Sequence, residues 1–176
     1  NRFDNRDIEI IKRILQRDLI GLENRKNLIE NLIKKFLKKN IFELTSNLYL
    51  NIEQLQKMKE LGMAFGSHGM THQWLNVLNK KDQLNEISES FLKLKNLNLI
   101  LDKDPQVICY PFGGFNDHTI DICKYLGINF GFTCEYGEAN LKRHNSNILR
   151  LPRWDTNDYW DYKFKRPSNP EGIRNN

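Results

Sequence analysis

The chain has 176 residues and a formal net charge of +5, from 27 Lys and Arg against 22 Asp and Glu. With 39% hydrophobic residues it suits one domain with a modest core, and no apolar run is long enough for a transmembrane segment. Much of the positive charge falls on one amphipathic stretch, which is typical of a solvated helix face, so we expect no nucleic acid as a partner. The first residues are not a signal peptide, and we favour a cytoplasmic over a periplasmic or secreted location.

Residues 1–47 are predicted to form a helical hairpin. Apolar residues recur at helical spacing over residues 8–15 and again over residues 28–37. The stretch around residues 21–24 separates the two helices. Because this region has no catalytic signature, we interpret it as a helical insertion or lid.

From residue 48 onwards, helices and strands alternate. Asn51 and Asn79 are suited to cap helices, the first over residues 52–60 and the second running past residue 90. A further helix is expected over residues 119–126, and strands are expected at residues 63–66, 106–110 and 129–133. This alternation predicts parallel crossovers, so the loops that follow the strands should share one edge of the sheet.

Two of the four histidines, His68 and His72, lie four residues apart in a loop after the first predicted strand. A divalent ion needs neutral imidazoles that converge from one side, and this spacing allows it. Such a pair also occurs by coincidence on polar surfaces. The strand before the loop and the glycines within it favour a metal site.

The three cysteines form no C-x-x-C pair, so they indicate neither a disulfide framework nor a zinc knuckle. We interpret Cys123 and Cys134 as small core residues. Cys109 is treated separately because it adjoins a motif.

Three motifs together resemble the polysaccharide deacetylase family. The sequence SHGMTH at residues 67–72 is similar to the family's His-Ser/Thr-x-x-His metal motif. The sequence YPFGGFN at residues 110–116 resembles a loop of its exopolysaccharide-processing branch, and RLPRWD at residues 150–155 resembles its later Arg/Trp/Asp segment. The resemblance implies an α/β fold, a partial distorted (β/α) barrel over residues 48–162, after the helical segment 1–47 and before a polar tail at residues 163–176.

The resemblance also implies hydrolysis of N-acetyl groups from an acetylated amino sugar or surface polysaccharide. The family uses a divalent metal ion, expected to be zinc, held by two His and one Asp, with a neighbouring Asp as general base. The ion polarises the amide carbonyl and lowers the pKa of its bound water, and the base takes the proton. Carried over to this chain, His68 and His72 would be the metal ligands, and the backbone N–H of Phe112 would stabilise the oxyanion.

The remaining site residues each have an alternative structural interpretation. Pro111 would fix the turn that aims the oxyanion donor, and Arg153 would orient the base or pair with a nearby aspartate. Tyr110, Trp154 and Asp155 would line the substrate site. Tyr110 could instead simply end its strand, and a Trp in so small a domain is more often a core residue.

The sequence also departs from the family pattern. The Thr-Phe-Asp-Asp-Gly motif that supplies the third ligand and the base is absent, with only an echo at residues 3–5, and so is the late Leu-x-His motif. Cys109 stands where many relatives carry an Arg. We therefore expect an N-terminally truncated deacetylase that is inactive by itself, and the alternative is a non-catalytic carbohydrate-binding relative.

Overall fold

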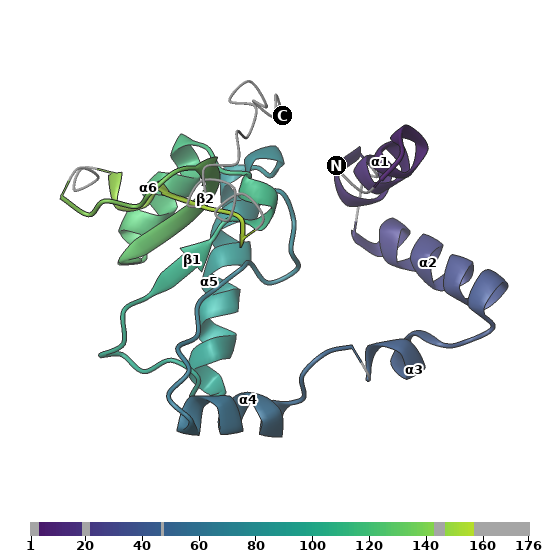
Figure 1. Ribbon diagram of the computed structural model, residues 1–176, viewed down its shortest axis with the longest axis horizontal. Coiled ribbons are helices and arrows are strands. Elements are labelled where there is room, and N and C mark those ends of the chain that lie inside the picture. Colours follow the sequence, from purple (N-terminus) through teal and green to yellow (C-terminus); the bar gives the residue numbers. More distant parts are fainter. Residues whose placement is uncertain (1–3, 19–21, 47, 143–146, 157–176) are drawn as a thin grey trace. The chain divides into compact units, whose positions relative to one another are not determined.

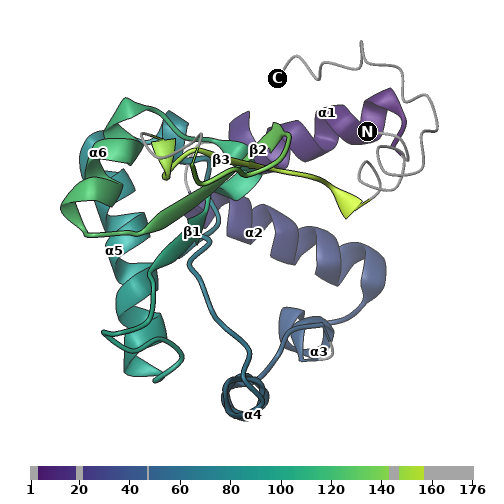
Figure 2. The same cartoon turned by 60° about the vertical axis from the view of Figure 1, so that its left-hand side comes forward.

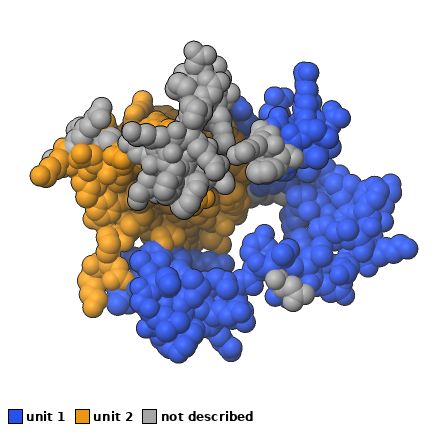
Figure 3. All heavy atoms as spheres, viewed as in Figure 1, with its two compact units in different colours: residues 1–65, 93–101 blue, residues 66–92, 102–176 orange. Residues whose placement is uncertain are grey.

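The computed structural model describes residues 4–18, 22–46, 48–142 and 147–156 (Figure 1 and Figure 2). The predicted tail at residues 163–176 lies outside this described part. The chain divides into two compact units, which Figure 3 shows in different colours. Unit 1 comprises residues 1–65 and 93–101, and unit 2 comprises residues 66–92 and 102–176.

Unit 1 is built from short helices that begin at capping side chains. The amide oxygens of Asn5, Asn40 and Asn51 each accept a hydrogen bond from a backbone N–H in the first turn of a helix. The helices predicted within residues 1–45 and over residues 52–60 are confirmed where the structure describes these ranges, while the pairing of the first two helices as a hairpin stays a prediction. The elements are α1 (Arg6–Arg13), α2 (Leu22–Leu32), α3 (Ile41–Thr45) and α4 (Ile52–Glu60), with π-helical turns η1 (Ile14–Asp18) and η2 (Ile33–Leu37).

Unit 2 contains a parallel sheet of three strands in the order β1-β2-β3. The strands are β1 (Val107–Cys109), β2 (Phe130–Tyr136) and β3 (Leu151–Arg153). The first two confirm the parallel strands predicted near residues 106–110 and 129–133. The described residues form this small open sheet, so the α/β class is confirmed, but they do not show the predicted barrel.

The strand predicted at residues 63–66 is wrong. After Gly62, whose φ of 89° ends α4, the chain stays mostly exposed and unpaired up to Gly66. A single parallel bridge then forms at Ser67, whose N–H donates to the Val107 carbonyl at 2.8 Å and whose carbonyl accepts from the Cys109 N–H at 2.9 Å. This one-residue pairing is enough to fix the following loop beside β1.

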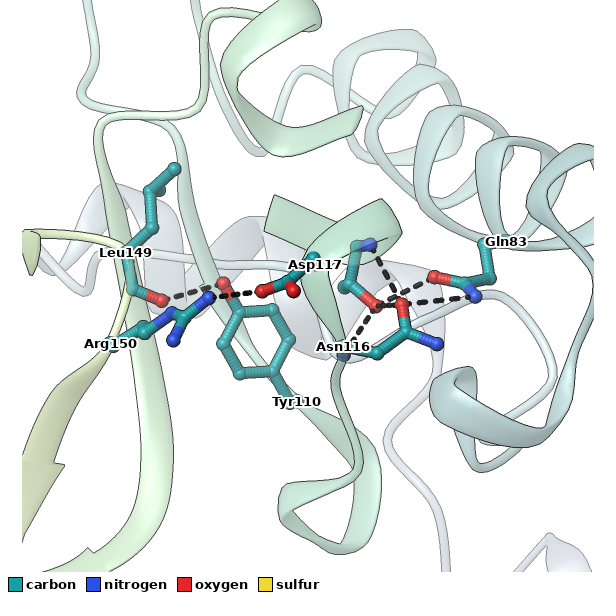
Figure 4. A network of polar contacts seen from close by, with 7 residues as sticks. Gln83, Tyr110, Asn116, Asp117, Leu149 and Arg150 are labelled. Atoms are coloured by element: carbon teal, nitrogen blue, oxygen red, sulfur yellow. Dashed lines mark hydrogen bonds and ion pairs between the residues drawn. The ribbon is translucent and has the colours of Figure 1, made fainter. Parts of the chain in front are cut away.

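Two helices of unit 2 are joined by buried polar side chains. Helix α5 (Lys80–Asn96), which continues into unit 1, carries Gln83, and α6 (Asp117–Tyr125) carries Thr119; both side chains are fully buried. The Thr119 hydroxyl donates to Gln83 Oε1 at 2.6 Å, next to the capping residue Asn116 (Figure 4). Because Asn116 caps α6, this helix begins two residues before its predicted start.

The core of unit 2 is apolar and continuous with these contacts. Its members come from α5, β1 and the residue after it, α6, β3 and the turn η3 (Leu75–Val77), and they include Leu75, Ile87, Phe91, Ile108, Tyr110, Ile120, Ile122 and Leu151. No helix within the described ranges has the length and apolar character needed to cross a bilayer. The cytoplasmic location stays a prediction.

Candidate functional site

The three sequence motifs meet at one end of the parallel sheet, where its strands finish. Because Ser67, β1, β2 and β3 all run in the same direction, the residues that follow them lie at the same end. The contacts agree with this topology. His68 Nδ1 lies 2.7 Å from the Cys109 carbonyl oxygen, and the Arg153 guanidinium lies 4.0 Å from the Cys109 sulfur.

The two histidines converge through their ring nitrogens. The Nε2 atoms of His68 and His72 are 3.0 Å apart, and the rings meet edge to face with centroids separated by 4.7 Å. Since a carbonyl oxygen can only accept, Nδ1 of His68 must donate to Cys109, and in the neutral tautomer that this contact selects Nε2 would keep its lone pair. Two imidazole nitrogens this close can both reach one ion at about 2.0–2.1 Å.

Left-handed backbone conformations curl the histidine loop. Gly69 has φ 77° and His72 has φ 56°. The second is a conformation that costs a non-glycine residue of order 1–3 kcal/mol, so it persists only where neighbours hold it. His72 is held in part by the ring of Phe112, whose centroid lies 4.5 Å away.

Phe112 is central to a short turn, η4 (Pro111–Gly113), just after β1. It too is left-handed, with φ 55°, and its ring stacks on Trp74 at 4.9 Å. The backbone N–H groups of Gly113 and Gly114 donate hydrogen bonds to the carbonyl oxygens of Tyr110 and Pro111, respectively. The Phe112 N–H makes no hydrogen bond to any residue that the structure describes, and its role as an oxyanion donor stays a prediction.

Tyr110 and Trp154 lie in structural rather than open positions. The Tyr110 side chain is fully buried, its hydroxyl donates to the Leu149 carbonyl at 2.7 Å, and burial raises its pKa (Figure 4). This placement agrees with the interpretation in which Tyr110 ends its strand. Trp154 packs edge to face against Tyr136, with ring centroids 4.0 Å apart, and Asp155 is exposed.

Arg153 faces two thiols. One of its amino groups lies 3.4 Å from the Cys134 sulfur and another 4.0 Å from the Cys109 sulfur. The hydrogen bond to Cys134 is the largest cause of a raised Arg153 pKa, and Asp155 contributes less. Cys134 is exposed, so its assignment to the core is wrong, whereas Cys123 is buried as predicted. Burial alternates along β2 only as far as Thr133, and the last three residues of the strand, which begin with Cys134, are exposed.

The sequence analysis missed Glu86. This residue lies on the buried face of α5 and accepts hydrogen bonds from the histidine loop. A signal was present in the spacing, because Gln83, Glu86 and Ser90 recur along the same helical stripe as the apolar residues of α5. Polar residues on such a stripe indicate specific partners.

The described residues bring together two candidate ligands for an ion, not three. No group of three or more His, Cys, Asp or Glu within the described ranges could hold a metal ion. Asp4, from the echo at residues 3–5, instead forms an ion pair with Lys12 at 2.6 Å within unit 1. The donor chemistry of His68 and His72 still fits a divalent ion, because both present an imidazole nitrogen to one point.

Comparison with known proteins identifies the family. Residues 18–131 match the family model for polysaccharide deacetylase, and the chain belongs to this family. Among solved structures it resembles the Streptococcus pyogenes deacetylase PplD in complex with acetate, with 31% identity and a TM-score of 0.52 over 60% of this chain and 44% of that one.

Two curated relatives are similar over the same part of the chain. One is "Putative polysaccharide deacetylase YxkH" of Bacillus subtilis (strain 168), 28% identical over 113 residues, which are 61% of this chain and 39% of the relative. The other is poly-beta-1,6-N-acetyl-D-glucosamine N-deacetylase of Staphylococcus aureus (strain MRSA252), 29% identical over 124 residues, or 65% and 41%. The chain therefore spans about two fifths of the length of these relatives.

Proposed function

We propose that this chain is part of a metal-dependent N-deacetylase that removes N-acetyl groups from an acetylated amino sugar in a polysaccharide. The observation that carries the proposal is the 3.0 Å approach of the His68 and His72 Nε2 atoms beside the turn of Phe112. Family membership supports the reaction class. The Staphylococcus relative is named for an N-acetylglucosamine polymer, and PplD holds acetate, which is the acid released when an N-acetyl group is hydrolysed.

The chain's own residues have distinct parts in this reaction. His68 and His72 would hold the ion, for which we propose zinc, and the Cys109 carbonyl fixes the tautomer that His68 needs. When bound, such an ion supplies polarisation of the amide carbonyl and a water of lowered pKa. The Phe112 N–H would donate to the oxygen that becomes negative as the amide carbon turns tetrahedral.

The third ligand and the general base are proposed to come from outside the described residues. Arg153, at the same edge of the sheet, would hold the base in its ionised form through its cationic guanidinium. General-base assistance is typically worth 10²–10⁴-fold in rate. We therefore expect little or no deacetylation by the 176-residue chain alone.

Acetate release from N-acetylglucosamine oligomers tests the proposal. We expect turnover from a longer chain that includes an Asp-Asp strand, and loss of most of it on His72→Ala or on chelation of the metal. His118→Ala is the matched control, because this histidine is exposed on α6. Undiminished turnover in His72→Ala would overturn the metal-site assignment. Binding of the oligomer without turnover in either chain would instead favour a carbohydrate-binding relative.

A further inference from the structure

The carboxylate of Glu86 is directed at the loop between the two histidines. The residue is only 8% exposed. Its Oε2 atom accepts hydrogen bonds from the backbone N–H groups of Met70, at 3.0 Å, and Thr71, at 2.9 Å. Two successive amides that point to one carboxylate form a concave anion-binding turn, which is a geometry that an unattached loop does not keep.

The second carboxylate oxygen and the backbone of Glu86 bind the same loop. Oε1 accepts from the Thr71 hydroxyl at 2.5 Å and from the Gln73 side-chain amide at 3.4 Å. The Glu86 carbonyl accepts from the Met70 N–H at 3.1 Å. All of these donors belong to residues 70–73, so the hydrogen-bonding capacity of this carboxylate is directed to the loop.

No ion pair accounts for the buried charge. Within the described residues Glu86 has no Lys or Arg partner, so its charge is stabilised by the N–H and O–H donors of the loop. Removing this carboxylate takes the acceptor from the Thr71 N–H and leaves the Met70 N–H with the Glu86 backbone carbonyl alone, which is costly. The loop would relax in order to hydrate them.

A second contact from α5 holds the other side of His68. The hydroxyls of Ser90 and Ser67 lie 2.5 Å apart, and Ser67 immediately precedes His68. Gly69 completes the fit, because a Cβ there would come within 3.3 Å of Glu86 Oε2. The loop is thus attached to one helix on both sides of the first histidine.

From these contacts we propose that Glu86 is a positioning residue that holds the histidine loop so that His68 and His72 converge on one ion. The inference rests on the proposed function of these histidines as metal ligands. In this proposal Glu86 does not contact the imidazole ring of either histidine. It acts through the backbone of residues 70 and 71. It stabilises the curl that places His72 at its strained φ of 56°.

Zinc titration by isothermal calorimetry provides the main test. We expect Glu86→Ala to weaken zinc binding by about 10–100-fold, the range found when groups that orient metal ligands are removed. Glu86→Gln keeps one acceptor oxygen for the two amides, so it should restore most of the affinity. Glu89→Ala is the matched control, since Glu89 is exposed on the same helix. Equal affinity for Glu86→Ala and Glu89→Ala would overturn the proposal.

A double-mutant cycle separates positioning from general support of the fold. In a His72→Ala background there is no pair left to position, so Glu86→Ala should cause no further loss of zinc affinity. Additive losses would show that Glu86 acts through overall stability, against the proposal. If Glu86→Ala fails to fold, Thr71→Val removes one donor and leaves the carboxylate, and a several-fold loss of affinity is expected; an unchanged affinity would contradict the proposal.

The outcome for the proposed function can be distinguished from the outcome for Glu86. Absence of zinc binding by the unsubstituted chain would count against the proposed function. Amide hydrogen exchange at residues 69–72 then tests Glu86 without metal. Faster exchange in Glu86→Ala and Thr71→Val, but not in Glu86→Gln or Glu89→Ala, supports the positioning role, and equal rates in all variants overturn it.

Discussion

The helices of residues 6–60 and the sheet unit that follows have similar local sequence signals. They differ in how far their apolar side chains are buried. In the first region none of the described residues from 4 to 65 is buried, and Ile11 is 55% exposed. In the second, Ile108 of β1 is fully buried. Because helices shorter than about 12–15 residues are marginal by themselves, capping and periodicity produce helices, while burial makes a stable unit. The candidate site lies in unit 2, which holds most of the buried apolar residues.

The largest expected effect compares two isoleucines. Ile108→Ala should lower the free energy of unfolding by about 2–5 kcal/mol, because it leaves a cavity in the core of unit 2. Ile11→Ala in α1 should change it by no more than about 0.5 kcal/mol. Urea unfolding followed by the fluorescence of Trp74 and Trp154, both in unit 2, reports the stability of that unit for both variants. Similar losses for the two variants would mean that α1 has a buried face in solution.

The parts of the fold that were predicted correctly are those with local causes. Asn51 begins α4 and Asn79 accepts the Asp82 N–H at 2.9 Å, as their capping chemistry predicts. The strand β3 was missed because three residues with a central proline have no strand pattern, and such a proline is tolerated only at a sheet edge. The strand expected at residues 63–66 is the opposite case. These residues have the apolar pattern of a strand, but they pair with no other strand among the described residues.

The candidate site also divides into features with local causes, which were predicted, and features that depend on distant residues, which were not. The spacing of His68 and His72 predicted a convergent pair, and the structure places their Nε2 atoms 3.0 Å apart, while the metal they would bind stays a prediction. The contacts of Arg153 with Cys134 could not be predicted, because they depend on how β2 and β3 register. Glu86 was missed because the two donors to its Oε2 are backbone amides, which the sequence does not distinguish.

The next effect is a pH dependence confined to the core of unit 2. Burial raises the pKa of the Cys123 thiol from 9.0 to about 11, and the Tyr110 hydroxyl lies 3.9 Å from its sulfur. Below about pH 9 the Cys123 thiol is protonated in both the folded and the unfolded state, so its full contribution to stability is present. Between about pH 9 and 11 the unfolded state loses its proton first, so stability should fall by about 2–3 kcal/mol.

The Cys123→Ala variant should lack this part of the fall in unfolding free energy. The difference between the pH profiles of the original chain and the variant therefore measures it. Cys134→Ala is the control, because Cys134 is exposed and should leave the slope unchanged. The measurement sharpens the comparison of the two regions, since Cys123, the fully buried cysteine among the described residues, lies in unit 2. Parallel profiles for the original chain and Cys123→Ala would contradict the assignment.

The smallest expected effect comes from two matched helix caps. Asn51 and Asn116 each begin a nine-residue helix with a reciprocal capping box, one in each unit. Replacing either by Ala removes a hydrogen bond worth about 0.5–2 kcal/mol to its own helix. The two losses should nevertheless differ in the unfolding of unit 2. Helix α6 buries Ile120 and Ile122 in the core, so Asn116→Ala should lower the urea midpoint, whereas α4 buries no residue and should only fray.

Amide hydrogen exchange distinguishes fraying from unfolding at each cap. For Asn51→Ala we expect faster exchange in the first turn of α4 with an unchanged urea midpoint. For Asn116→Ala we expect the midpoint itself to fall, by an amount that includes the weak contact from the Gln83 side-chain amide at 3.4 Å. Equal shifts of the midpoint would show that α4 unfolds together with the sheet. In that case the exposed apolar residues of unit 1 would belong to the same cooperative structure as the histidine site, and substitutions in α4 should then alter zinc affinity as well.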